Sequence, residues 1–212
     1  MPERELVTHK VVRPVRLAVL ISGGGRTLRN LLTRIESGEL RATVCMVISS
    51  RPGVRGLSIA AEADIPAQVV TRTAFDTDQV FSNEIYRHCA SFEAELIICA
   101  GFLKRLVVPP EWEGRILNIH PALIPESGAA GAGYFGDRVH RAVIESGALV
   151  TGATVHVVDN EYDHGPIVLK QSIPVRVGER ADELAARVFE VECELYPRAI
   201  QTYINTHPGL FG

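Results

Sequence analysis

The segment NIHPALIP, residues 118–125, holds the side chains best suited to chemistry in this 212-residue chain. Asn118 and His120 stand two residues apart at the end of a short apolar run. In an extended strand such residues project from the same face, so the amide and the imidazole should point the same way. Pro121 and Pro125 then end regular structure. Because an amide can stabilise an oxyanion and an imidazole can move a proton, the pair suits acyl transfer.

Composition places the chain among ordinary soluble globular proteins, with 46% hydrophobic and 22% charged residues. The net charge of −3 gives no indication of a nucleic-acid-binding surface, and no segment reaches the roughly 20 apolar residues of a membrane span. The seven histidines lack metal-ligand spacing, so no metal is expected. No CxxC pair occurs among the cysteines, which predicts reduced thiols in a cytoplasmic protein: Cys45, Cys89, Cys99 and Cys193. Monomer and homodimer both remain open.

Strand and helix patterns alternate through the first half of the chain. Strands are expected at 15–22, 43–49, 67–70, 95–100 and 115–120, and helices at 28–35, 56–63 and 75–89. Near-continuous apolar strands separated by helices predict an α/β fold with a mostly parallel, Rossmann-like sheet flanked by helices. Ligands of such sheets bind beyond the carboxyl ends of the strands.

The second half predicts a C-terminal antiparallel hairpin and a closing helix. The expected elements are a Gly/Ala-rich mobile loop, a short helix, two hairpin strands and a long helix, at 126–136, 138–146, 151–159, 167–175 and 181–202. Pro197 should kink or break the last helix. Residues 1–14 are expected to form an N-terminal extension, and residues 15–212 a single domain.

The glycine-rich turn Gly23–Gly25 joins the first strand to the first helix and predicts a phosphate site. Its backbone N–H groups and the helix N-terminus favour an anion, and Arg26 could add a charge-assisted contact. The turn lacks the GK[ST] of a Walker loop, and Leu28 departs from the dinucleotide fingerprint. Arg51, after the second strand, is compatible with NADP. A reductase and an enzyme of a small phosphorylated substrate therefore both remain open.

The turn EYDHGP, residues 161–166, supplies a second candidate for chemistry. If the hairpin folds over the cleft, Asp163 can reach His120, and a carboxylate beside an imidazole stabilises the imidazolium. His164 is a possible competing partner for that interaction. The interaction of Asp163 with His120 would keep His120 a proton donor near neutral pH.

Several motifs, in this order, resemble the glycinamide ribonucleotide formyltransferase (phosphoribosylglycinamide formyltransferase) family: AVLISGGGRTL, AGF, NIHPALIP, TGATVHVVDNEYDHGPIVLKQ and VFEVECELYP. The resemblance runs from about Val15 to Tyr203. It implies the formyltransferase fold, with a ribotide-binding half at 15–120 and a folate-pocket and closing half at 121–212. It also implies formyl transfer from 10-formyltetrahydrofolate to the amine of glycinamide ribonucleotide in de novo purine biosynthesis. The products are formylglycinamide ribonucleotide and tetrahydrofolate.

The same resemblance implies roles for particular residues. The catalytic trio would be Asn118, His120 and Asp163. Contacts to the ribotide would come from Gly25, Arg26, Thr27 and Glu192. The folate pocket would be lined by Leu103, Lys104, Arg105, Leu106, Asn118, Asp159, Asn160, Glu161 and Tyr162. The sequence departs from the family with GGGRTL for the common GNGSNL, with LKRL for MRIL, and with His164 for a common glycine.

Three other functions are open to a chain with these motifs. A formyltetrahydrofolate deformylase is less favoured, because such chains carry NIHH and an N-terminal regulatory domain. A methionyl-tRNA formyltransferase would need a further C-terminal domain and a basic surface. A catalytically silent folate- or nucleotide-binding regulator would not need Asn118, His120 and Asp163 together.

Overall fold

A computed structural model describes residues 13–124 and 136–211 of the chain. All but the last two residues of the expected extension 1–14 lie outside this described part. The same holds for the expected mobile loop 126–136, apart from Gly136. Of the helices in the described ranges, none is both long and apolar enough to cross a membrane.

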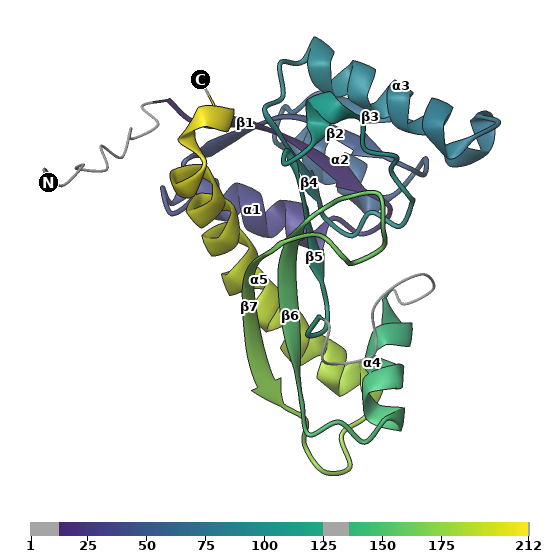
Figure 1. The fold of residues 1–212 in the computed structure, drawn as a ribbon, viewed down its shortest axis with the longest axis vertical. Coiled ribbons are helices and arrows are strands. Elements are labelled where there is room, and N and C mark those ends of the chain that lie inside the picture. The colour runs from purple at the N-terminus through teal and green to yellow at the C-terminus, as the bar shows by residue number, and fades with distance from the viewer. Residues whose placement is uncertain (1–12, 125–135, 212) are drawn as a thin grey trace, which may run out of the picture.

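One sheet of seven strands organises the described part of the chain (Figure 1). The strands are β1 (Val15–Ile21), β2 (Ala42–Ser49), β3 (Ala67–Val69), β4 (Leu96–Cys99), β5 (Ile116–His120), β6 (Val150–Val157) and β7 (Ile167–Pro174). Their order is β3-β2-β1-β4-β5-β6-β7, parallel from β3 to β5 and antiparallel from β5 to β7. The predicted mostly parallel sheet with a C-terminal hairpin is confirmed.

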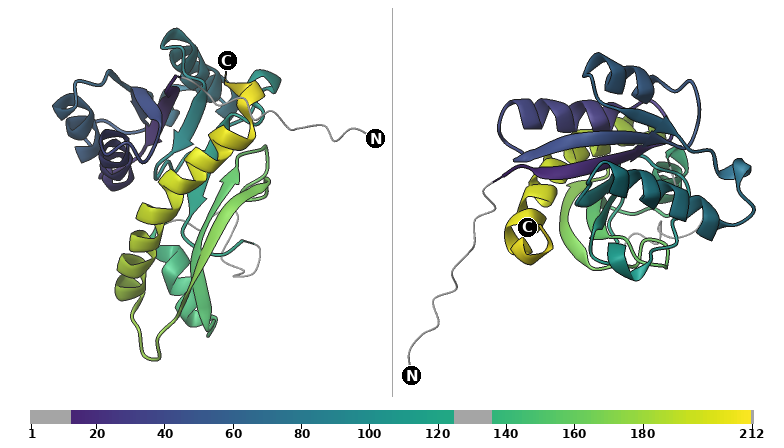
Figure 2. Two further views of the ribbon diagram at one scale, coloured as in Figure 1. Left: turned by 90° about the vertical axis from the view of Figure 1, so that its left-hand side faces the viewer. Right: turned by 90° about the horizontal axis from the view of Figure 1, so that it is seen from above.

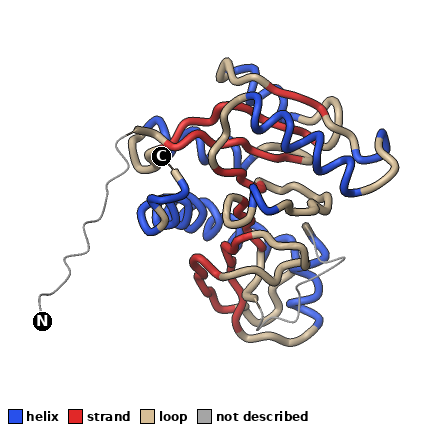
Figure 3. Tube along the Cα trace, turned by 45° about the horizontal axis from the view of Figure 1, so that its top comes forward, coloured by secondary structure: helices blue, strands red, loops and turns tan. Residues whose placement is uncertain are grey.

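Helices cover both faces of the sheet, as the alternation of β1 requires. Val15, Leu17, Val19 and Ile21 share one core with residues of α1 (Arg26–Glu36), α2 (Arg55–Glu62), α4 (Asp137–Glu145) and α5 (Ala181–Thr206). The intervening Ala18 and Leu20 share the second core with α3 (Asp78–Ser91). Successive strand residues face opposite sides, so a strand buried on both faces reads as an unbroken apolar run. Figure 3 shows the helix–strand alternation along the chain.

Helix α5 runs unbroken from Ala181 to Thr206, so of the kink or break expected at Pro197, the break does not occur. A proline has no N–H for the carbonyl four residues earlier, here that of Cys193. The Asn30 side chain of α1 donates to that carbonyl oxygen at 2.9 Å. A tertiary hydrogen bond thus satisfies the freed acceptor and ties α5 to α1. Figure 2 shows α5 running along the β6–β7 hairpin.

The chain reverses its direction of travel across the sheet between β1 and β4. From β1 it winds outward to β2 and β3, then returns to the other side of β1 with β4. Ligand sites of open α/β sheets lie at such a switch point, beyond the strand ends. The Tyr196 hydroxyl of α5 lies 3.1 Å and 2.9 Å from the carbonyl oxygens of Cys99 and Leu117. These contacts hold α5 against β4 and β5.

Candidate active site

A cleft of about 390 Å³ lies beyond the carboxyl ends of β1, β4 and β5. Helix α5 forms one wall, and the turn between β6 and β7 forms another. The cleft is lined by every residue to which the family resemblance gives a role: Gly25, Arg26, Thr27, Leu103, Lys104, Arg105, Leu106, Asn118, His120, Asp159, Asn160, Glu161, Tyr162, Asp163 and Glu192. Residues from opposite ends of the chain thus share a single cavity.

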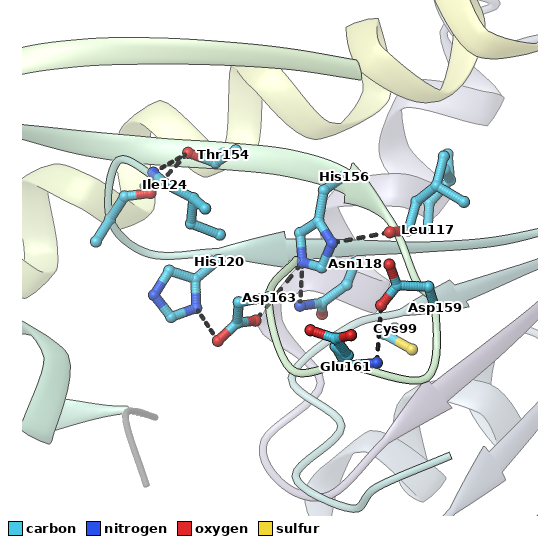
Figure 4. A network of polar contacts seen from close by, with 12 residues as sticks. Cys99, Leu117, Asn118, His120, Ile124, Thr154, His156, Asp159, Glu161 and Asp163 are labelled. Carbon is cyan, nitrogen blue, oxygen red and sulfur yellow. Dashed lines mark hydrogen bonds and ion pairs between the residues drawn. The ribbon is translucent and has the colours of Figure 1, made fainter. Parts of the chain in front are cut away.

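Asp163 lies between two imidazoles at the centre of the cleft (Figure 4). Its Oδ2 is 3.6 Å from Nδ1 of His120, and its Oδ1 is 3.6 Å from Nε2 of His156. All three side chains are largely buried, at 4% exposure for each histidine and 11% for the aspartate. Charge interactions are screened less in such a site than at the surface. The carboxylate can therefore stabilise positive charge that develops on His120.

His156 orients the amide of Asn118. Its Nδ1 lies 3.0 Å from the carbonyl oxygen of Val157, which can only accept, so Nδ1 carries the hydrogen. In the neutral ring Nε2 is then an acceptor, and Nδ2 of Asn118 donates to it at 3.1 Å. The Asn118 amide has a second N–H hydrogen, which remains for an oxygen in the cleft.

The turn that carries Asp163 is fixed by its backbone. Asp163 has a φ of +52°, the left-handed region that asparagine and aspartate tolerate better than most residues. A Cβ at Gly165 would lie 1.9 Å from the Val157 carbonyl oxygen, so glycine is required there. His164 points elsewhere: its Nδ1 lies 2.9 Å from Oδ2 of Asp159. This hydrogen bond raises the pKa of His164, whose partner is Asp159, so His164 is not the competitor considered from the sequence.

The loop after β4 is tied to the same turn. The Asn160 side chain pairs with the backbone of Val108, accepting from its N–H at 2.8 Å and donating to its carbonyl oxygen at 3.1 Å. Nη2 of Arg105 donates to the Asn160 carbonyl oxygen at 3.2 Å. The N–H of Leu103 donates to Oγ of Ser22 at 2.9 Å. These bonds hold the 103–106 segment against the cleft from both ends.

The glycine-rich turn after β1 leaves an open helix N-terminus. Gly25 has a φ of +71°, and a Cβ there would meet Cα of Gly56 at 2.6 Å, so the turn itself requires this glycine. At Gly23 and Gly24 a Cβ would meet nothing within 4 Å. No side chain caps α1, and its first turn has no acidic residue. Backbone N–H groups of the turn are accordingly available to an anion.

Glu192 adds a carboxyl group to the α5 wall. Burial raises its pKa to about 7, and the nearby charge of Arg26 opposes that rise. It therefore changes charge near neutral pH.

Cys99 also lines the cleft, but burial raises the pKa of its thiol to about 12, so it is not poised as a nucleophile. Among residues 13–124 and 136–211, no cluster of three or more His, Cys, Asp or Glu could hold a metal ion.

His156 and Phe189 line the cleft and make contacts within it, but the sequence alone did not predict either as a site residue. The alternation of residues 151–159 placed His156 on a strand face, but only the register that sets it opposite Asn118 reveals its partner. Phe189 lies beside the apolar stripe of α5, at helical spacing from Ala185 and Glu192, which also line the cleft. Counting back three residues from Glu192, about one helical turn, would have indicated Phe189 as a cleft-facing position.

Comparison with known proteins agrees with this geometry. Residues 15–200 match the family model described as formyl transferase. The chain is 31% identical to phosphoribosylglycinamide formyltransferase of Escherichia coli (strain K12), covering 90% of this chain and 88% of that protein. It is similar in structure to glycinamide ribonucleotide transformylase 1 of Symbiobacterium toebii, with a TM-score of 0.81 and 33% identity over 89% of this chain and 86% of that one.

Larger proteins contain a similar region. The chain is 38% identical to part of the trifunctional purine biosynthetic protein adenosine-3 of Gallus gallus, over 88% of this chain but only 18% of that protein. With the Drosophila melanogaster protein of the same name it shares 36% identity, over 91% of this chain and 14% of that protein. The chain thus spans less than a fifth of these relatives. The match over residues 15–200 and the full-length relatives establish that the chain belongs to the formyl transferase family.

Proposed function

We propose that the protein transfers the formyl group of 10-formyltetrahydrofolate to the amine of glycinamide ribonucleotide. The products are formylglycinamide ribonucleotide and tetrahydrofolate, as in de novo purine biosynthesis. The observation that carries the proposal is the 3.6 Å approach of Asp163 to His120 in a cleft that also contains the glycine-rich turn. An acid–base centre and an anion site in a single cavity suit a phosphorylated acceptor and a formyl donor.

In the proposed reaction the acceptor's amine attacks the formyl carbon, and the carbonyl oxygen gains negative charge. The second N–H of Asn118 and the protonated ring of His120 stabilise that oxyanion. His120 delivers its proton to N10, directly or through water, as the carbon–N10 bond of the folate breaks, and the proton lost by the amine passes to His120 directly or through water, which restores the protonated ring. Asp163 stabilises the imidazolium, and His156 orients Asn118. Alignment of both substrates in the cleft supplies much of the rate.

The substrate-binding roles follow the two ends of the cleft. Backbone N–H groups of Gly25, Arg26 and Thr27 hold the phosphate, and Glu192 accepts from ribose hydroxyls. The folate lies against the loop and turn segments 103–106 and 159–162, with Asn118 between the two substrates. We further propose action in the cytoplasm, without metal or nucleic acid, as a monomer or homodimer.

His120→Ala tests the chemical role. Single-turnover formyl transfer should fall by about 100- to 10,000-fold, as expected for loss of a positioned acid–base group, while both dissociation constants change by less than about threefold. The matched control is His164→Ala, an exposed histidine in the turn that pairs with Asp159 and should retain turnover within about threefold. Turnover of His120→Ala near the wild-type rate would remove His120 from the chemistry.

A further inference from the structure

Arg26 and Phe189 make a contact between the two walls of the cleft. Cζ of Arg26 lies 4.0 Å from the centroid of the Phe189 ring. Arg26 is the first residue of α1 and directly follows the glycine-rich turn, whereas Phe189 lies in α5. A guanidinium over an aromatic face is attracted by the negative π surface, and Arg is the cation best suited to it.

The ring, and not a carboxylate, holds this guanidinium. Arg26 is solvent-exposed and forms no salt bridge or side-chain hydrogen bond with another residue of the described ranges. Glu192 lines the same wall one turn from Phe189, and within those ranges its carboxyl group makes no salt bridge either. The contact with the ring uses none of the guanidinium N–H groups in a hydrogen bond to another residue of the described ranges, so these donors remain for a ligand.

The surroundings of Arg26 favour an anion as that ligand. The adjacent turn offers uncapped N–H groups and the open space beside Gly23 and Gly24. Arginine donates two parallel hydrogen bonds to phosphate oxygens, and a helix N-terminus adds partial positive charge. Arg26, in the segment GGGRTL, places a permanent positive charge at the first residue of α1.

We propose that the Arg26 side chain binds the phosphate of a ribose phosphate monoester, and that Phe189 is the positioning residue that presents it. This deepens the proposed function, on which the identity of the acceptor rests. Without the ring face, Arg26 would lose its preferred orientation and could turn to the Glu192 carboxylate. Preorganisation of a flexible cation raises affinity, because less side-chain freedom is lost on binding.

Four variants test the proposal through the dissociation constant of glycinamide ribonucleotide. Arg26→Ser should raise it about ten- to a hundredfold, the range for a hydrogen bond to a charged group, and Arg26→Lys should raise it less. Phe189→Leu should raise it about three- to fivefold, and Phe189→Tyr, which keeps the aromatic face, should stay within about twofold. The turnover number at saturation should change by less than about threefold in the Arg26 variants, because the phosphate is remote from the formyl carbon.

The phosphate-free analogue glycinamide riboside supplies the control substrate. Wild type and Arg26→Ser should bind it equally, because only the phosphate distinguishes them. In the Arg26→Ser background, the Phe189→Leu change should have no further effect on ribotide binding, since the ring acts through Arg26. Equal loss of affinity for both ligands would overturn the phosphate role. An undiminished Phe189→Leu effect in the double variant would overturn the positioning role.

Binding of ribose 5-phosphate by calorimetry separates this inference from the proposed reaction. If the wild type shows no formyl transfer but Arg26→Ser weakens ribose 5-phosphate binding, the anion site stands and the reaction is wrong. If the wild type turns over and Arg26→Ser binds the ribotide normally, the reaction stands and the anion role is wrong. Thermal unfolding of all variants establishes that they are folded.

Discussion

Replacing Asp163 with asparagine removes a negative charge from between two imidazoles and keeps the shape of the turn. Asparagine tolerates the φ of +52° at this position, so the backbone should not change. At the observed 3.6 Å, Coulomb attraction between a carboxylate and an imidazolium is about 4–5 kcal/mol at an effective dielectric constant of about 20. The amide oxygen of asparagine recovers part of this through its dipole.

The loss should appear in the chemical step. We expect about 3–4 kcal/mol less transition-state stabilisation, or a single-turnover rate lower by roughly 100- to 1000-fold, with little change in either dissociation constant. Asp159→Asn is the control, because it removes a carboxylate from the same turn whose partner is the exposed His164. It should cost less than about tenfold in rate. If folded Asp163→Asn kept its rate within tenfold of the wild type, the electrostatic argument would be refuted.

Three further changes test other parts of the account. The pKa of Glu192 is raised from 4.5 to about 7 in the folded protein, so its ionisation opposes folding, and stability should fall as the pH rises between these values. Glu192→Gln should abolish this decrease, which thermal unfolding at pH 4.5 and 8 measures. Asn160→Ala breaks both bonds to Val108 and should raise the KM for the folate donor about tenfold, with the turnover number within threefold, in steady-state assays. Asn30→Ala leaves the Cys193 carbonyl without its side-chain donor and should cost about 1 kcal/mol in urea unfolding; an unchanged midpoint would contradict that role.

Much of the fold was predictable because local patterns and the sheet agree. The apolar run of β1 alternates between two cores, so its burial on both faces could be read from its composition. Asn118 and His120 could be paired because a strand projects residues i and i+2 together. The predicted starts of helices were less accurate. Helix α3 begins at Asp78, three residues after the expected start, because Thr77 caps it by accepting from the Val80 N–H.

Contacts that depend on tertiary register were not predictable. His156 gains its role only from lying opposite Asn118 across an antiparallel pair, and no local pattern sets that register. Pro197 carries a local signal to end a helix, which packing and the donor from Asn30 override. The Arg26–Phe189 contact joins helices at opposite ends of the chain, so neither residue alone indicates the other.

The most direct test of formyl transfer is the loss of the formyl group from 10-formyltetrahydrofolate, followed with and without glycinamide ribonucleotide. A formyltransferase should turn over only with the ribotide, and formylglycinamide ribonucleotide should appear in an amount equal to the formyl group lost. Equal turnover without the ribotide would indicate a hydrolase. No turnover in either case would contradict the transferase assignment and favour a silent binder or a reductase, which NADPH titration would distinguish.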